Sequence, residues 1–417
     1  MKIQQFEVSG LHGNEESITL NFHDDLNILS GRNGAGKTTI LKLMWYLCSG
    51  NFDKAVAEIK FNSALLITDK YRLEVEINYD EKENPLKSNL TLKSTNVIKD
   101  FESDEMLSKL ITSTKNKDIG WFLTQYIDSS FFMPTFRMIE GGFTTEKYDI
   151  QHDVLKEFYL DINKDNDYND IAIALYKLSK KLSKKNHKFI TSISANDIDI
   201  FLVKKYAEIM KKVNITQGES VSLLSNQIQI MYKNEKDNLD ILKSINKKLT
   251  ALTNEISLLN DPLDKIKKSI NYFMPQFKIG FDEKVYFTHI DGSGLNTDEH
   301  EIEFNIEPYS DFDDTYEYEE YSEDLNKLNQ LTINNLSAGE KQLLTFVAYN
   351  IFHNDTIFFI DEPELSLHVD WQNKLFSLLK EQNSSNQFII STHSPFIYSL
   401  FPDKELIIDA DKGCSEF

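Results

Sequence analysis

The segment at residues 31–39 constrains the fold of this chain more than any other stretch. It reads Gly-Arg-Asn-Gly-Ala-Gly-Lys-Thr-Thr and lies between an apolar run at residues 26–29 and a helical stretch at residues 40–47. Glycines at this spacing let backbone N–H groups point inward at phosphate oxygens, and the amino terminus of the following helix adds its dipole. The order of strand, loop and helix therefore predicts an α/β fold with a phosphate-binding loop.

Two side chains at the end of this loop carry the expected chemistry. Lys37 is placed to reach the β and γ phosphates of a nucleotide, and the Thr38 hydroxyl is placed to bind Mg²⁺. A glycine-rich loop of unrelated purpose is the alternative, and the flanking strand and helix argue against it. The predicted nucleotide-binding residues of the loop are Gly31, Arg32, Asn33, Gly34, Ala35, Gly36, Lys37, Thr38 and Thr39.

A carboxylate pair, Asp361 and Glu362, directly follows a second apolar run at residues 357–360. The run predicts a buried strand, and ligand sites in α/β sheets lie at the carboxyl ends of strands. Asp361 is suited to hold Mg²⁺, and Glu362 is suited to orient or deprotonate an attacking water. Paired acids alone are a weak signal, but behind a phosphate-binding loop they predict a metal ligand and a catalytic base.

Two further segments complete the predicted site. His393 follows the apolar strand at residues 388–390, where an imidazole can hydrogen-bond the γ phosphate and sense its loss. Ser337 is placed to cap a helix, Glu340 three residues later completes a capping box, and Gly339 leaves the neighbouring backbone open to a phosphate. The alternatives are a structural histidine and a helix that is simply well capped.

Composition narrows the class of protein. The 417 residues include 45 Lys and Arg against 66 Asp and Glu, a net charge of −21, and only two Cys. This acidic balance excludes a protein whose whole surface binds nucleic acid, and two thiols are too few for a disulfide framework or a four-ligand zinc site. No stretch approaches the roughly 20 apolar residues that cross a bilayer, and the amino terminus lacks a signal-peptide core. We therefore expect a cytoplasmic protein with no membrane contact.

The sequence changes character twice, which predicts three segments at residues 1–150, 151–275 and 276–417. The outer two carry strand patterns and the motifs above, whereas the middle one is Lys-rich and helical. An arm through residues 202–213, a turn at Gly218 and a return arm predict an inserted coiled-coil hairpin, with a compact helical bundle as the alternative. The return arm follows the 4-3 spacing of a heptad seam at Leu224, Ile228, Met231, Leu242, Ile245, Leu249, Leu252, Ile256 and Leu259.

Two charged stretches bear on partners. Eight Asp and Glu at residues 309–324, with no Lys or Arg among them, repel one another and predict a solvated loop. Six lysines spaced 3, 1, 3, 1 and 3 predict one helical face that can contact phosphates, with a solvated lysine face as the alternative. The six are Lys177, Lys180, Lys181, Lys184, Lys185 and Lys188.

Together these motifs resemble the ABC-class ATPases, in the branch that contains the SMC proteins, RecF and the OLD-like ATPases. Residues 31–39 match Walker A, residues 336–342 (LSAGEKQ) the ABC signature, residues 358–368 (FFIDEPELSLH) Walker B with the D-loop, and residues 391–395 (STHSP) the switch histidine. The resemblance implies an ABC-type head with a mixed sheet and an antiparallel strand layer. It also implies Mg²⁺-dependent ATP hydrolysis between two copies, with Ser337 and Gly339 of one closing on the γ phosphate held by the other.

The Q-loop glutamine of that family is not evident. Arg137, after a strand that ends near Pro134, is a candidate phosphate-contacting or coupling residue, and Gln125 is a less suitable substitute. We assign no Q-loop residue.

The layout and the stretch at residues 137–142 look like the ATPase subunits of bacterial anti-phage systems such as PARIS. This resemblance implies a nucleotide-driven sensor or scaffold, a homodimer or an oligomer of dimers, that controls an effector. Because the sequence continues only briefly after residues 391–395, we expect a nuclease-type effector in a separate chain. The alternative is an SMC- or RecF-like DNA-repair or DNA-clamping ATPase that uses the lysine set.

Overall fold

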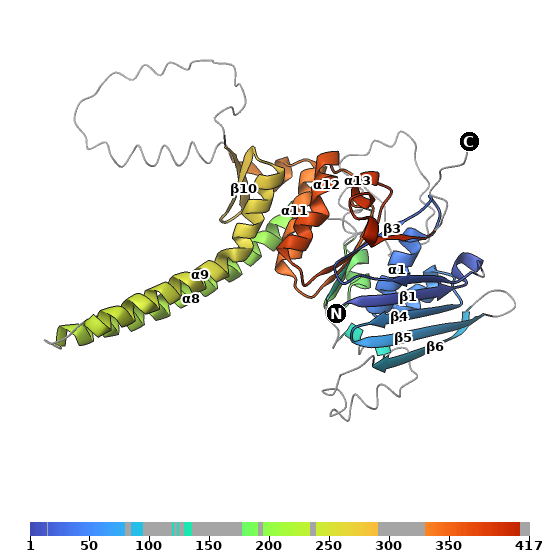
Figure 1. Cartoon of the computed structure of the whole chain (residues 1–417), viewed down its shortest axis with the longest axis horizontal. Coiled ribbons are helices and arrows are strands. Elements are labelled where there is room, and N and C mark those ends of the chain that lie inside the picture. Colours follow the sequence, from blue (N-terminus) through green and yellow to red (C-terminus); the bar gives the residue numbers. More distant parts are fainter. Residues whose placement is uncertain are drawn as a thin grey trace, which may run out of the picture. The chain divides into compact units, whose positions relative to one another are not determined.

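The computed structural model in Figure 1 describes residues 1–14, 16–79, 85–94, 119–120, 123–124, 129–135, 177–190, 195–233, 239–290 and 330–408. The chain separates into two compact units. Unit 1 comprises Met1–Ile193 and His353–Phe417, and unit 2 comprises Ser194–Phe352. The three-segment division stays a prediction.

The centre of unit 1 is a six-stranded sheet in the order β14-β3-β13-β12-β7-β8, in which all neighbouring pairs are parallel. Strands of a parallel sheet are buried on both faces, so they read as continuous apolar runs. Strands β3, β12 and β13 are accordingly buried at every position, which confirms the predicted α/β fold. The bounds are β3 Leu26–Ser30, β7 Ser130–Met133, β8 His187–Phe189, β12 Ile357–Asp361, β13 Gln387–Ser391 and β14 Glu405–Ile407.

The second sheet of unit 1 is antiparallel, in the order β2-β1-β4-β5-β6. Buried residues alternate with less buried ones along β5, because one face of the sheet packs into the core. The same core contains Trp45, Phe132 and Phe189, whose ring centroids lie 5.1 to 5.7 Å apart. The bounds are β1 Ile3–Ser9, β2 Ile18–Asn21, β4 Ser63–Thr68, β5 Tyr71–Tyr79 and β6 Pro85–Ser94.

The helices of unit 1 pack around these sheets and are short. In both units, none of the described helices is both long and apolar enough to cross a membrane. The bounds in unit 1 are α1 Lys37–Cys48, α2 Phe52–Glu58, α12 Val369–Gln382 and α13 Pro395–Tyr398, with 3₁₀ turns η1 Leu11–Gly13 and η3 Pro402–Lys404.

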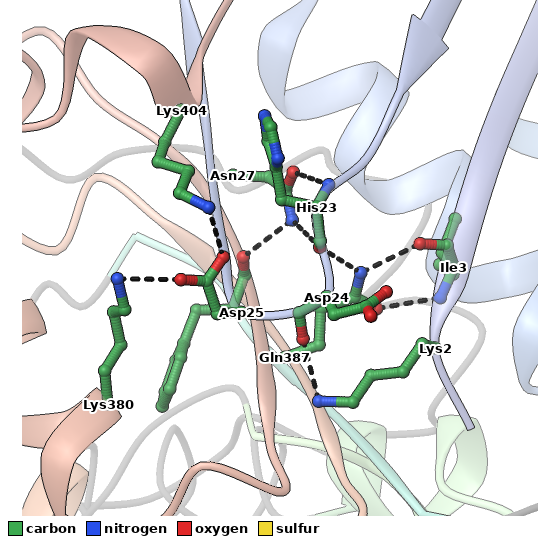
Figure 2. Close-up of polar contacts among 10 residues, drawn as sticks. Lys2, Ile3, His23, Asp24, Asp25, Asn27, Lys380, Gln387 and Lys404 are labelled. Atoms are coloured by element: carbon green, nitrogen blue, oxygen red, sulfur yellow. Dashed lines mark hydrogen bonds and ion pairs between the residues drawn. The ribbon is translucent and has the colours of Figure 1, made fainter.

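Figure 2 shows a polar cluster that joins the two sheets of unit 1 where the chain enters β3. Asp25 forms ion pairs of 2.7 Å with both Lys380 and Lys404. The Gln387 side chain accepts a hydrogen bond from the Ile3 N–H and donates one to the Ile3 carbonyl, each at 2.8 Å. Because Ile3 belongs to β1 and Gln387 to β13, these bonds fix the antiparallel layer against the parallel sheet.

Unit 2 contains two long helices, α8 and α9, that lie side by side in Figure 1. Leu263, Ile266, Ile270 and Phe273 are buried, which continues the predicted 4-3 spacing beyond Leu259 toward the end of α9. The predicted seam residues Leu242 and Leu249 are instead 50% and 42% exposed. The bounds are α8 Ala195–Lys233, α9 Leu239–Phe273, α11 Ala338–Phe352, η2 Ile333–Asn335, and the antiparallel strands β9 Phe277–Phe281, β10 Val285–His289 and β11 Leu331–Thr332.

The predicted turn at Gly218 is wrong. Helix α8 runs through Gly218 to Lys233, so Leu224 belongs to the first long helix and not to a return arm. A single glycine costs a helix only about 1 kcal/mol, which the packing of a helix of this length offsets. The predicted polar interruption at Glu235 and Asn238 lies outside the described residues.

The predicted single helical face of lysines is also wrong. The helix at residues 177–182 ends before Lys184, Lys185 has a positive φ of 47°, and Lys188 lies in β8. The pairing of β8 with β7 takes these residues into the sheet, and a local spacing rule cannot anticipate a partner strand so far away in the sequence. The predicted acidic loop at residues 309–324 lies outside the described residues.

The ion pairs of Asp25 lead to a prediction about stability. Partial burial acts to raise the pKa of Asp25, but the hydrogen bonds from Lys380 and Lys404 outweigh it and lower the pKa of this carboxyl below its ordinary value. We expect Asp25→Asn to lower the free energy of unfolding by about 1 kcal/mol at neutral pH, because it removes two partly exposed ion pairs. Urea denaturation of both proteins measures this difference.

The difference should shrink with acid. The stabilisation is complete above the unfolded-state pKa of about 4 and is lost as the pH falls through the lower pKa of the folded state. Glu381→Gln, at an exposed position on α12, is the matched control and should change stability little. An equal loss in both variants, or a loss that persists at low pH, would contradict the prediction.

Candidate functional site

The carboxyl ends of β3, β13 and β12 lie next to one another, because the three strands are parallel neighbours in that order. Strand β3 leads into the glycine-rich loop, β12 ends at Asp361 and β13 ends at Ser391, two residues before His393. The structure therefore brings the predicted loop, carboxylate pair and histidine to one edge of the sheet in unit 1.

The loop has the backbone that its glycines predict. Gly34 and Gly36 have φ values of 85° and 87°, in the left-handed region that favours glycine. Lys37 begins α1, and its buried ammonium group donates hydrogen bonds to the carbonyls of Gly31 at 3.0 Å and Arg32 at 2.9 Å. Burial lowers the pKa of Lys37, while the negative charges of Glu362, Asp361 and Glu364 act to raise it. The ammonium group thus lies close to the predicted carboxylates.

Asp361 is the most heavily hydrogen-bonded group of the site. Its buried carboxylate accepts a hydrogen bond from the Thr38 hydroxyl at 2.8 Å, from the Thr135 hydroxyl at 2.7 Å and from the Ser391 hydroxyl. Three hydroxyl donors fix the orientation of this carboxylate. Thr135 and Ser391 were not predicted, because only the strand order places them beside Asp361.

The oxygens of Thr38 and Asp361 fit Mg²⁺. A carboxylate and a hydroxyl are hard oxygen ligands, and they lie within 2.8 Å of each other. Mg²⁺ commonly binds through one or two carboxylates and takes its other ligands from phosphate oxygens and water. The pair therefore matches an ion that binds together with a nucleotide.

Glu362 has an unusual backbone. Its φ is 48°, in the left-handed region, and its N–H donates to the Ser391 carbonyl at 2.9 Å. Such a conformation costs a residue with a side chain about 1–2 kcal/mol, and it is found most often where a site requires it. The backbone bond to β13 holds the residue in this conformation at the end of β12.

The surroundings of Glu362 favour its neutral form. Burial raises the pKa of Glu362, the negative charges of Asp361 and Glu364 raise it further, and His393 and Lys37 oppose them. A carboxyl with a raised pKa beside a phosphate-binding loop is suited to accept a proton from water.

Two hydrogen bonds join the segments that follow β12 and β13. The His393 N–H donates to Glu364 at 2.8 Å, and the Ser394 hydroxyl donates to Gln372 at 2.6 Å. The Gln372 amide also donates to the Leu367 carbonyl at 2.9 Å. Glu364 and Gln372 were not predicted as site residues. For Glu364 the sequence signal is the cluster of acids that begins at Asp361.

Ser337 and Gly339 lie in unit 2 at the amino terminus of α11. The Ser337 N–H donates to the Glu340 carboxylate at 2.7 Å, and the Glu340 N–H donates to the Ser337 hydroxyl at 3.4 Å. These two bonds confirm the capping box. Ser337 is exposed and Gly339 is buried. Their closure on a second copy stays a prediction, and Gln125 and Arg137 lie outside the described residues.

The chain belongs to the AAA ATPase domain family (AAA_15), whose profile matches residues 1–398. Membership of this family makes the chain an ATPase.

Two relatives share part of their length with this chain. The Retron Vc95 probable ATPase of Vibrio cholerae serotype O1 biovar El Tor is 31% identical over 93 residues, which cover 19% of this chain and 18% of that protein. Endonuclease GajA of Bacillus cereus strain VD045 is 22% identical over 397 residues, which cover 92% of this chain and 54% of that protein. The chain therefore spans about half or less of the length of these relatives.

Solved structures of SMC heads also align with the chain. The SMC head of Pyrococcus furiosus with an extended coiled coil, bound to the C-terminal domain of ScpA, gives a TM-score of 0.35 at 12% identity, with 95% of this chain and 91% of that chain covered. The SMC head domain of Thermotoga maritima gives a TM-score of 0.39 at 10% identity, with 96% and 92% covered.

The backbone of Glu362 leads to a prediction that separates folding from function. We expect Glu362→Gly to be more stable than Glu362→Ala by about 1 kcal/mol, because glycine adopts the left-handed conformation without the penalty that a Cβ incurs. Denaturant unfolding of the two variants measures the difference. Equal stability, or a more stable alanine variant, would show that Glu362 is not strained in the folded protein.

Proposed function

We propose that this chain binds ATP with Mg²⁺ at residues 31–39 and Asp361, and hydrolyses it with Glu362 as the base. The observation that carries the proposal is the meeting of Lys37, Asp361 and Glu362 at one sheet edge, with Asp361 hydrogen-bonded to Thr38. Bound Mg²⁺ would supply electrostatic stabilisation of phosphate charge.

Each residue has a separate task in this proposal. Lys37 exchanges the carbonyls of its own loop for the β and γ phosphates, at little cost because its ammonium group is already desolvated. Thr38 and Asp361 hold the cation. Glu362 orients and deprotonates the water, and His393 contacts the γ phosphate and reports its loss.

We propose that the complete site forms between two copies of the chain. The support is the amino terminus of α11, where Ser337 is exposed and the dipole of a 15-residue helix favours an anion. In this arrangement Ser337 and Gly339 of one copy close on the triphosphate held by the other. The assembly is a homodimer or an oligomer of dimers.

We propose that the ATPase acts in bacterial anti-phage defence as a nucleotide-driven sensor or scaffold that controls a separate nuclease-type effector in the cytoplasm. Its support is the similarity to a retron ATPase and, over most of this chain, to an endonuclease roughly twice as long. Helices α8 and α9 form the inserted coiled-coil hairpin in this proposal. Purification of the intact chain with and without ATP, followed by identification of a co-purifying nuclease, tests the role.

Two substitutions separate nucleotide binding from hydrolysis. Glu362→Gln should retain ATP, lower the hydrolysis rate by at least about 100-fold and hold a dimer, because the amide cannot take the proton. Lys37→Ala should abolish nucleotide binding, because the phosphates lose their cation. Equilibrium binding of ATP, phosphate release and light scattering measure the three effects.

Lys42→Ala is the matched control, since Lys42 lies on the same helix and pairs with Glu58 at a distance of 2.5 Å. It should bind and hydrolyse ATP like the parent chain. Hydrolysis by Glu362→Gln at the parental rate would refute the assignment of the base. If the protein stays monomeric at high concentration with a bound non-hydrolysable nucleotide, the proposal of a site shared between two copies is refuted.

The charge of Glu364 predicts a shift in the pH dependence of hydrolysis. Burial, Asp361 and Glu364 raise the pKa of Glu362, so the activity should fall in acid at a higher pH than for an ordinary glutamate. Glu364→Gln removes one negative charge and should move this acid limb to lower pH, while its amide oxygen can still accept the His393 N–H. Hydrolysis rates measured as a function of pH give the pH at which activity falls in acid. Glu381→Gln should not change this pH, and an unchanged value in Glu364→Gln would contradict the prediction.

A further inference from the structure

The segment at residues 177–190 contains six lysines and no Asp or Glu, although the whole chain has a net charge of −21. Lys184 has a structural place in it, because its half-buried ammonium group donates to the Gly50 carbonyl at 2.5 Å and burial lowers its pKa. The other five lysines are exposed. They are Lys177, Lys180, Lys181, Lys185 and Lys188.

One of these lysines, Lys188, lies in the edge strand of the parallel sheet. Strand β8 is the last strand in the sheet order, and its burial alternates so that Lys188 is exposed between the buried His187 and Phe189. The other four exposed lysines precede β8 by ten residues or fewer in the sequence. Strand β8 and the segment that leads into it therefore carry a dense positive charge on an acidic protein, the electrostatic feature that attracts a polyanion.

A polar cavity of about 380 Å³ lies beside this edge. Lys188 lines it together with Phe131, its partner in the β7–β8 register. Phe131 is itself buried and stacks on Phe358, and its ring packs edge-on against the partly exposed His353 with ring centroids 4.6 Å apart. The imidazole of His353 is therefore the aromatic ring that the cavity wall presents. The remaining lining residues are polar: Ser129, Asn186, Asn354 and Asp355.

The cavity is separate from the ATP site. Its polar residues immediately precede β7, β8 and β12, so the cavity lies at the amino ends of these strands. The glycine-rich loop and the Asp361 carboxylate lie at the carboxyl ends of the sheet. No residue of the cavity has a role in the proposed hydrolysis.

We propose that this edge binds single-stranded nucleic acid, with the exposed lysines on the backbone phosphates and one base in the cavity. Lysines supply a sequence-independent, salt-sensitive attraction, the His353 ring can stack on a base, and the amide side chains of Asn186 and Asn354 can hydrogen-bond it. Asp355 repels a phosphate from the cavity but accepts a hydrogen bond from the amino group of a base. A base in a duplex is stacked and cannot enter, which favours a single strand.

The test uses the full chain and a labelled single-stranded DNA of about 20 nucleotides, long enough to span the site of one binding fold. Binding by fluorescence anisotropy should weaken steeply with salt. The charge-reversed triple variant Lys177→Glu, Lys180→Glu, Lys188→Glu should reduce the slope of log affinity against log salt by about 2, since each phosphate contact in a single strand contributes about 0.7. It should still bind ATP like the parent, which shows that it is folded.

The matched control is Lys211→Glu, Lys212→Glu, Lys248→Glu, which reverses three exposed lysines on α8 and α9 with the same change in net charge. It should retain the parental affinity and slope. An abasic strand should bind less tightly to the parent, and Asn186→Ala should reduce this preference for the normal strand. Absence of salt-dependent binding, equal loss in both triple variants, or equal affinity for duplex and single strand would each overturn the proposal.

Discussion

The buried carboxylate of Asp361 is the group on which the arrangement of the site depends. It accepts hydrogen bonds from hydroxyls on three different segments, the start of α1, the end of β13 and the stretch after β7. A buried carboxylate without such donors would destabilise the fold. The same contacts that make its burial tolerable therefore also bring the glycine-rich loop, the acidic pair and the His393 segment to one edge.

The local chemistry of the site was predictable from the sequence because its signals are contiguous. Glycines with positive φ, a lysine at the start of a helix and two acids at the end of an apolar strand each occupy a few adjacent residues. The strands were predictable for a similar reason, since burial on both faces leaves an unbroken apolar run. Thr135, Ser391 and Gln372 carry no such signal, because their partners are defined by the order of strands in the sheet.

The wrong predictions of a turn at Gly218 and of a single lysine face have a common physical origin. A glycine in α8 and a lysine spacing near β8 are local preferences of about 1 kcal/mol or less. The cooperative extension of a long helix overrides the first, and the pairing of β8 with β7 overrides the second. Gly218 stays within a long helix, and Lys184 leaves its expected helical face to bond a distant carbonyl. The turn at Gly218 and the helical face of lysines were therefore less predictable than the glycine-rich loop, whose backbone conformation only glycine adopts readily.

Hydrogen bonds connect each end of helix α1 to a different part of unit 1. Its first residue, Lys37, closes the glycine-rich loop, and two residues past its last turn the Gly50 carbonyl accepts a hydrogen bond from Lys184. The Asn51 amide adds a second bond, 2.9 Å to the Leu182 carbonyl. A helix of 12 residues is a stiff rod of about 18 Å, so a shift of its phosphate end displaces the lysine-rich end as well. Helix α1 therefore connects the nucleotide site at residues 31–39 with the lysine-rich segment at residues 177–190, so a movement at one could be transmitted to the other.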